Sequence, residues 1–209
     1  MGVIGLRSHQ QSPARRVLIG SALAGLLLLG GCSALFPSAP PDTFDLTAPT
    51  HVSARGNGRA QILITEPTAL SALDSERILV LPGNSEVTYL PGAQWADRLP
   101  RLVQARMVQT FENAHRIGMV GRPEDKFTPD ASLVTEIRDF QIEASGRPVA
   151  VVTIAARVVS QNTGRIIAAN LFTARVPTNG TGGRFASAAL DQALQQVLVE
   201  ILAWTSGKV

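Results

Sequence analysis

A short apolar run near the start of the chain predicts which residues are removed and which remain to form the folded domain. Residues 17–31 are apolar or small, follow Arg15 and Arg16, and end at Gly30 and Gly31. A positive end, an apolar middle and small residues at the cut are the order of a secretory signal peptide. The run falls short of the about 20 apolar residues that a membrane-spanning helix needs. We therefore expect residues 1–31 to be removed on export and to take no part in the fold.

The residue that follows this run, Cys32, is the only cysteine of the chain. A thiol directly after Leu-Gly-Gly, at the end of an apolar segment, matches the bacterial lipobox. The match predicts a diacylglycerol on the Cys32 sulfur, cleavage before this residue and acylation of the new N-terminus. Each buried methylene contributes about 0.8 kcal/mol, and stable anchoring takes more than one chain, which a triacylated cysteine supplies. The alternative is a cleaved signal followed by an incidental cysteine.

The residues after Cys32 indicate which membrane holds the lipid anchor and how the anchor is joined to the domain. Ser33 stands where an aspartate would retain an enterobacterial lipoprotein in the inner membrane, so its presence predicts the outer membrane and its periplasmic face. Residues 32–42 are rich in proline and small residues, which is typical of an extended tether. The sequence thus predicts a signal peptide (1–31), a tether (32–42) and one domain (43–209) that a lipid holds to the membrane.

The charge of the mature chain excludes some classes of partner. The full sequence has 19 Lys and Arg against 16 Asp and Glu, but three arginines and no acidic residue precede Cys32. The mature chain is therefore formally neutral. A nucleic-acid binder would need a basic stripe, and attachment to anionic lipid by charge alone would need a basic cluster. We expect neither, and with one cysteine the domain must be stabilised by packing rather than by disulfides.

The periodicity of residues 43–209 predicts an α+β fold, with a mostly antiparallel sheet and two main helices packed on one face. Strands are expected at 43–47, 61–65, 75–81, 86–90, 117–120, 132–143, 149–160 and 165–176, and helices at about 99–116 and 184–206. Pro91-Gly92 should end the hairpin of 75–81 and 86–90, and a bulge near Asp139 would align the apolar side chains of 132–143. The last helix should place Phe185 and Leu190 on the sheet; the alternative is a membrane-surface helix.

An inventory of reactive residues does not favour catalysis. After the signal only His51 and His115 remain as histidines, and no His-x-x-x-His, Cys-x-x-Cys or Gly-x-Ser-x-Gly spacing exists. The carboxylates are scattered along the chain. Such side chains more often cap a helix or lie exposed to solvent than take part in a reaction. We therefore expect no catalytic residue, no metal site, no cofactor and no enzymatic activity.

Two motifs carry a resemblance to a known family. They are Leu73-Asp74-Ser75-Glu76-Arg77-Ile78 and the stretch Tyr89-Leu90-Pro91-Gly92-Ala93-Gln94-Trp95-Ala96-Asp97-Arg98-Leu99-Pro100. Together they resemble the ABC-type transport auxiliary lipoproteins, which include the paraquat-inducible protein C type. Phe44 stands where that family usually has Tyr. The resemblance implies a non-catalytic periplasmic partner of transporters with mammalian-cell-entry (MCE) domains, which move lipids between membranes.

The motif residues fall into two sets. Leu73, Asp74, Ser75, Arg77 and Pro100 are interpreted as structural residues of the corner between hairpin and helix. Three others are candidate partner contacts: Tyr89, Trp95 and Asp97. We expect Arg77 and Asp97 to pair across the corner. The alternative is that the two aromatic rings fill the core, and exposure of the Trp95 ring would favour a partner contact.

The sequence therefore predicts an outer-membrane lipoprotein that serves as the auxiliary subunit of an MCE-type lipid transporter and docks its periplasmic conduit. An envelope-assembly lipoprotein that binds cell-wall or outer-membrane proteins is an alternative, and a lipid-carrying domain with its own cavity is another. The sequence leaves open whether the subunit forms a homo-oligomer.

Overall fold

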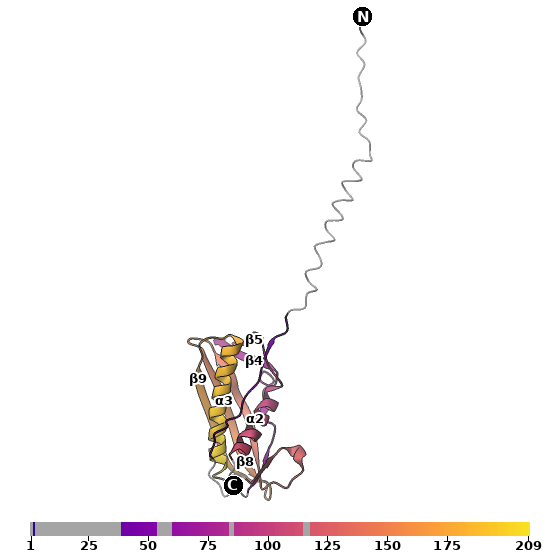
Figure 1. The fold of residues 1–209 in the computed structure, drawn as a ribbon, viewed down its shortest axis with the longest axis vertical. Helices are drawn as coiled ribbons and strands as arrows, with labels where there is room; N and C mark the ends of the chain where they lie inside the picture. The colour runs from indigo at the N-terminus through magenta and orange to yellow at the C-terminus, as the bar shows by residue number, and fades with distance from the viewer. Residues whose placement is uncertain (1, 3–38, 54–59, 84–85, 115–117) are drawn as a thin grey trace. The chain divides into compact units, whose positions relative to one another are not determined.

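The computed structural model describes residues 39–53, 60–83, 86–114 and 118–209, together with Gly2. Residues 40–209 form one compact unit, which contains the helices and strands described below (Figure 1). The signal peptide, Cys32 and most of the predicted tether lie outside the described residues, as do His115 and the turn at Asn84.

In the described part of the chain, nine strands, two α-helices and one 3-10 helix follow one another. They are β1 (Asp42–Phe44), β2 (Gln61–Ile64), β3 (Thr68–Ala69), β4 (Arg77–Gly83), β5 (Glu86–Trp95), α2 (Leu99–Asn113), β6 (Met119–Gly121), η2 (Pro123–Asp125), β7 (Ala131–Glu143), β8 (Val149–Ser160), β9 (Ile166–Pro177) and α3 (Gly183–Thr205). The two long helices and the long strands after residue 130 confirm an α+β fold.

Strand β7 is the centre of the sheet. Along one edge it pairs with β8 in an antiparallel ladder, and β8 pairs in turn with β9. Along its other edge it pairs with β2, then β3, then β4, all parallel to it. Residues 61–83 thus run beside β7 as one interrupted parallel strand. The sheet continues from β2 to β6 and from β4 to β5 and β1.

The sheet is therefore mixed, and the prediction of a mostly antiparallel sheet was wrong. The pairs of β1 with β5 and of β2 with β6 are parallel, as are the three pairs that β7 makes along residues 61–83. Parallel neighbours need a crossover, and helix α2 lies in the chain segment that leads from β2, β3 and β4 to β7. Hairpin turns in the sequence indicate pairing only between strands that follow one another in the chain. The parallel pairs therefore give no local signal in the sequence.

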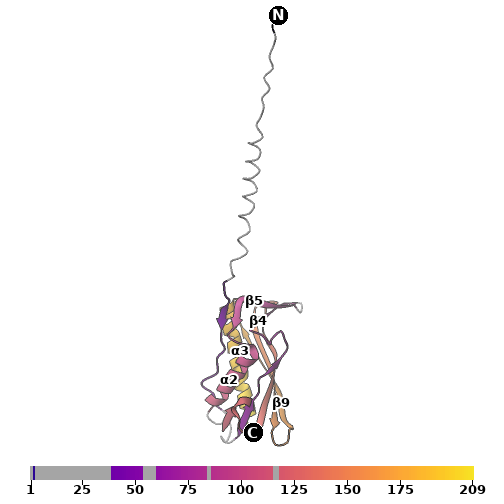
Figure 2. The ribbon, with the colours of Figure 1, turned by 90° about the vertical axis from the view of Figure 1, so that its right-hand side faces the viewer.

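Both helices pack on one face of the sheet and on each other (Figures 1 and 2). Alternate residues of β8, from Ala150 to Val158, point to that face and are almost fully buried. Their neighbours across the ladder include Ile137 and Phe140 of β7. Because a sheet presents every second residue to one face, this alternation forms the core under α3.

The hairpin of β4 and β5 does not end at Pro91-Gly92 as the sequence predicts. Arg77 pairs with Gln94 and Leu79 pairs with Tyr89, so four residues of β5 lie opposite one residue of β4. Pro91 has no amide hydrogen for the ladder, and Gly92 takes a φ of +68°, which favours glycine. Both are accommodated in this bulge, after which β5 continues to Trp95 and pairs with β1.

Other local predictions were confirmed. The ladder between β7 and β8 shifts between Ile137 and Asp139, where the bulge was expected. Helix α2 begins at Leu99 with Pro100 in its first turn. Helix α3 buries Leu190 as expected, but Phe185 is 53% exposed and does not belong to its buried face.

The segment after β1 holds the two helices together. Asp45 pairs with Arg106 of α2, with 2.7 Å between Oδ2 and Nη2. The Thr47 amide donates to Asp191 of α3 at 2.6 Å, and the Thr47 hydroxyl accepts a bond from Gln195 at 2.8 Å. The N-terminal segment therefore bonds to both helices.

Candidate partner-binding corner

The two motifs meet at one corner of the domain, which we call the motif corner: residues 70–77, between β3 and β4, and residues 95–101, from the end of β5 into α2. The first part is a tight turn. The amides of Leu73 and Asp74 both donate to the carbonyl of Leu70, at 2.8 and 2.9 Å. The hydroxyl of Ser75 accepts a bond from the Arg77 amide at 3.2 Å and so leads the chain into β4. The turn is therefore closed by its own backbone and one side chain.

Backbone hydrogen bonds join the second part to the first. The Trp95 amide donates to the carbonyl of Glu76 at 2.7 Å, and the Leu99 amide donates to the carbonyl of Ser75 at 3.1 Å. The amide of Leu99 is at the N-terminus of α2, where helical amides have no partner within the helix. The turn thus caps the helix, and this explains why two motifs about 20 positions apart occur in one chain.

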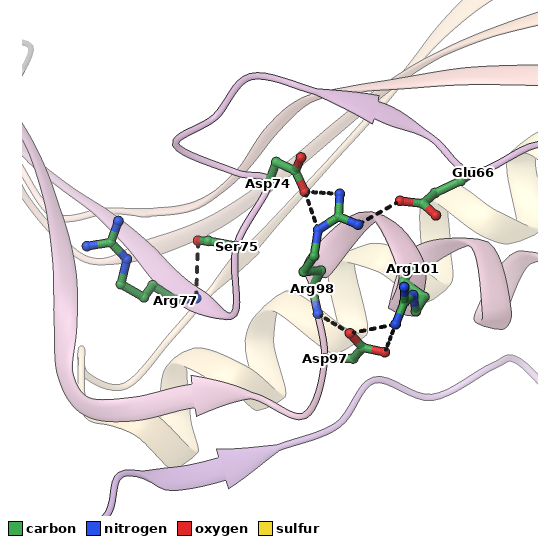
Figure 3. Close-up of polar contacts among 7 residues, drawn as sticks. All are labelled: Glu66, Asp74, Ser75, Arg77, Asp97, Arg98 and Arg101. Carbon is green, nitrogen blue, oxygen red and sulfur yellow. Dashed lines mark hydrogen bonds and ion pairs between the residues drawn. The ribbon is translucent and has the colours of Figure 1, made fainter.

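The side chain of Arg98 is the centre of the polar contacts at this corner (Figure 3). Its Nε lies 2.9 Å from Oδ1 of Asp74, and its Nη1 lies 3.4 Å from Oε1 of Glu66. The bond to Asp74 raises the pKa of Arg98 above its ordinary value. Exposed pairs of this kind contribute about 0.2–1 kcal/mol each, so the cluster orients the turn more than it stabilises the domain. Sequence reasoning missed Arg98 because a single arginine gives no signal of which carboxylates it will contact after folding.

Asp97 bonds within its own segment. Its Oδ1 accepts a hydrogen bond from the Arg98 amide at 2.7 Å, and its Oδ2 lies 3.2 Å from Nη1 of Arg101 (Figure 3). The Arg98 amide and, to a lesser degree, Arg101 lower the pKa of Asp97 below 3.8 despite some desolvation. A carboxylate at the start of α2 also faces the positive end of the helix dipole.

The expected pair between Arg77 and Asp97 does not form. The guanidinium carbon of Arg77 instead lies 3.6 Å from the centre of the Tyr89 ring, a cation–π contact. Tyr89 is paired with Leu79, which lies two residues along β4 from Arg77, so these side chains share one face of the sheet. The sequence places residues 77 and 97 near one corner, but the strand alternation directs Arg77 to the face without helices.

Trp95 belongs to the core. Its side chain is 1% exposed and packs edge-on against Phe140, with 5.8 Å between ring centres and 82° between ring planes. This is the core-packing alternative for Trp95, so its indole is not a contact surface. Leu73 and Pro100 are also buried, as expected of structural residues of the motif.

The corner also presents an apolar side chain that sequence reasoning missed. Leu70 is 76% exposed, although it lies on the same turn as the buried Leu73. A single leucine in a short segment without periodicity gives no signal of its exposure. The corner therefore exposes the apolar Leu70 and the charged groups of Asp97 and Arg101, while Arg77 stacks on Tyr89 of β5 on the face without helices.

Among the described residues, no group of three or more His, Cys, Asp or Glu side chains could hold a metal ion. None of the helices in the described ranges is both long and apolar enough to cross a membrane. His51 is exposed in a loop.

Comparison with known proteins places the domain among lipoproteins. A family model for the ABC-type transport auxiliary lipoprotein component matches residues 44–202. An uncharacterized protein of Bradyrhizobium diazoefficiens is 32% identical over 184 residues, which are 88% of this chain and 49% of that protein. This chain thus spans about half the length of that relative.

Solved structures share the fold. The crystal structure of protein XCC0632 from Xanthomonas campestris, of family DUF330, superposes with a TM-score of 0.73 at 27% identity and covers 80% of this chain and 96% of that one. The crystal structure of another uncharacterized protein superposes with a TM-score of 0.64 at 13% identity, over 78% and 97% of the two chains. The second similarity concerns the fold alone.

Proposed function

The chain belongs to the family of ABC-type transport auxiliary lipoprotein components, and from this premise we propose that it is the auxiliary subunit of an MCE-type ABC lipid transport system. In this role it is anchored to the periplasmic face of the outer membrane and docks the membrane-distal end of a periplasmic lipid conduit. Lipid then passes between the two bilayers without crossing water. The family match carries this proposal, and the features below support it.

The anchor and the tether set the reach of the domain in this proposal. The predicted lipid is on Cys32, and strand β1 begins at Asp42. The ten residues from 32 to 41 would span about 33–36 Å at full extension. A domain on such a tether can search for a protein in the periplasm while its first residue stays in the bilayer.

The motif corner is the surface that we assign to docking. Its turn is closed by backbone bonds, capped onto α2 and held by the ion pair of Arg98 with Asp74, so its shape exists before a partner binds. A preformed surface loses less conformational entropy on binding. Leu70 supplies exposed apolar area on this surface, and Asp97 and Arg101 supply charged groups, so the corner offers both kinds of group that interfaces combine.

The hollows on the described surface do not favour a lipid carrier. One, of about 470 Å³, is lined by Pro49 and by polar side chains of α3 that include Gln192 and Glu200. Another, of about 310 Å³, is lined by Arg138, Arg157 and other residues of β7, β8 and β9. The first is lined mostly by polar side chains and the second by polar and apolar residues in equal number, whereas acyl chains need an apolar lining throughout.

Crosslinking and co-purification of the tagged full-length chain from its own membranes tests the proposal. We expect an MCE-domain protein to be recovered. Leu70→Asp should reduce this recovery at least tenfold, because it replaces the exposed apolar side chain of the corner with a charge. Met119→Asp is the matched control, since Met119 is 50% exposed and lies in β6, after α2 has run about 22 Å from the corner.

Each outcome of this experiment separates the candidate functions. Recovery of an MCE-domain protein that is lost with Leu70→Asp and kept with Met119→Asp supports both the role and the corner. Recovery that neither change affects supports the role but moves the docking surface elsewhere. If only outer-membrane barrels or cell-wall enzymes are recovered, the envelope-assembly function replaces the one proposed.

A further inference from the structure

Strand β9 leaves a long edge of the sheet free. In the part of the chain that the structure describes, β9 pairs with β8 alone, over Ile166–Pro177. Its twelve residues contain one charge, Arg175, and their only proline is the last residue. Proteins usually protect an edge with short strands, charges or prolines. The terminal strands β1 and β6 are only three residues long, so β9 is the exception in this sheet.

We propose that the free edge of β9 pairs with β9 of a second copy of this chain, in an antiparallel two-fold arrangement that joins the two sheets. This inference concerns self-association. It does not depend on the proposed transport role.

The ladder shows which backbone groups of β9 are available. The amide of Thr178 donates to the carbonyl of Pro148 at 3.0 Å, so these two residues form a hydrogen-bonded pair. Such pairs alternate along an antiparallel ladder, which assigns the even-numbered residues of β9 from Ala168 to Val176 to β8; before Ala168 the ladder shifts register. Ala169, Leu171 and Thr173 therefore direct their N–H and C=O groups toward the free edge.

The side chains of the same residues lie on the face of the sheet that the helices do not cover. The even-numbered Phe172 is buried on the helix side, where its ring contacts Trp204 with 5.5 Å between centres. Leu171 is 49% exposed on the opposite face, and Ala169 is exposed beside it. A strand added at this edge would cover the apolar Leu171 without displacing α3.

The charge of β9 and the overlap of two β9 strands favour a second copy as the partner and determine the register between them. Two-fold registers centred on Leu171 and on Phe172 overlap equally, but the second would place Pro177, which has no amide hydrogen, in the hydrogen-bonded ladder. We therefore take the register that places Leu171 opposite Leu171 of the second copy. Ala169 then lies opposite Thr173, and Arg175 lies opposite Ile167 rather than its own counterpart. Like charges directly opposite one another destabilise a sheet, and this register avoids them. The edge therefore matches its own counterpart in backbone polar groups and apolar surface, and the register sets no like charges opposite one another.

Disulfide trapping in the full-length, membrane-anchored chain tests the pairing. In the proposed register, Leu171 and its counterpart form a hydrogen-bonded pair with about 5.5 Å between Cα atoms, within the range that a disulfide spans. We expect Leu171→Cys to give a crosslinked species of twice the chain mass under mild oxidant. Val199→Cys is the matched control, because Val199 is 40% exposed but lies on α3.

Two further changes in the Leu171→Cys chain test the edge itself. Ala169→Pro removes an amide that points to the free edge and none that bonds to β8, so it should reduce the crosslink to the control level. Ile167, which lies where the ladder with β8 shifts register, is opposite Arg175 of the second copy, and Arg175 pairs with Glu143 of its own chain. Ile167→Arg adds a like charge and should weaken the crosslink several-fold, whereas Ile167→Glu offers Arg175 a second carboxylate and should strengthen it. If Ala169→Pro fails to fold, the two Ile167 variants still decide the question.

Three results would overturn the proposal. One is a Leu171→Cys crosslink no stronger than that of Val199→Cys. Another is a crosslink to a different protein only, which would assign the edge to a foreign strand. The third is a double-mass crosslink that responds neither to Ala169→Pro, when that variant folds, nor to the sign of the charge at residue 167.

Discussion

Replacement of Trp95 by alanine separates core packing from partner contact. The ring is almost fully buried and packs edge-on against Phe140. Removal of a buried tryptophan ring costs about 3–5 kcal/mol, because its apolar contacts are lost and a cavity remains. A domain of this size unfolds with a free energy of about 5–15 kcal/mol. Trp95→Ala should therefore lower the melting temperature by about 6–20 °C, at 2–4 °C per kcal/mol.

Urea and thermal unfolding of residues 40–209, which form one compact unit, provide the measurement. Trp95→Phe should lose about 1–2 kcal/mol, since the smaller ring keeps part of the buried area. Leu70→Ala is the control from the same corner, and because Leu70 is exposed it should change the free energy of unfolding by less than about 0.5 kcal/mol.

The reasoning fails if Trp95→Ala changes the free energy of unfolding by less than about 1 kcal/mol with an unchanged dependence on urea. That result would mean that the indole contributes little to the stability of the core and that Trp95 has another role in the motif. Equal losses for Trp95→Ala and Leu70→Ala would contradict the assignment of one residue to the core and the other to the surface.

Two further changes test the motif corner and the start of α3. Because folding lowers the pKa of Asp97 below 3.8, Asp97 stabilises the domain above about pH 4, and this contribution is lost as the pH falls through the folded pKa. Asp97→Asn should thus be less stable at pH 7, and its urea curve should approach the wild-type curve near pH 2; a constant difference would argue against this role. Gly183→Ala would place a Cβ 2.9 Å from that of Ala93, so calorimetry should show a loss of about 1–3 kcal/mol, whereas Gly146→Ala, with open space around it, should show none.

Local chemistry explains what could be predicted of the fold. Pro100 is tolerated only in the first turn of a helix, and this placed the start of α2 correctly. The alternation of apolar residues fixed the long strands β7 and β8 and required the bulge that the ladder shows after Ile137. Such features depend on steric rules within a few residues, so one sequence is enough to read them.

The candidate site was predicted less completely. The motifs identified the corner and its buried residues Leu73 and Pro100, but they did not reveal Leu70 or the contact of Arg98 with Asp74. Both depend on how the turn before β4 folds onto the helix after β5. Arg77 was paired with the wrong group because the face to which a strand residue points depends on the register of its ladder.

The sequence by itself determined the periodicity of each element, the formally neutral charge of residues 32–209 and membership of a lipoprotein family, since these are properties of residue types and their spacing. Only the tertiary structure decided which strands lie side by side, which motif residues face the core and which edge of the sheet stays free. The physical reason is that strand pairing joins residues far apart in the chain: residues 61–83 pair with β7 only because α2 allows a parallel return. No local preference encodes that choice of neighbour.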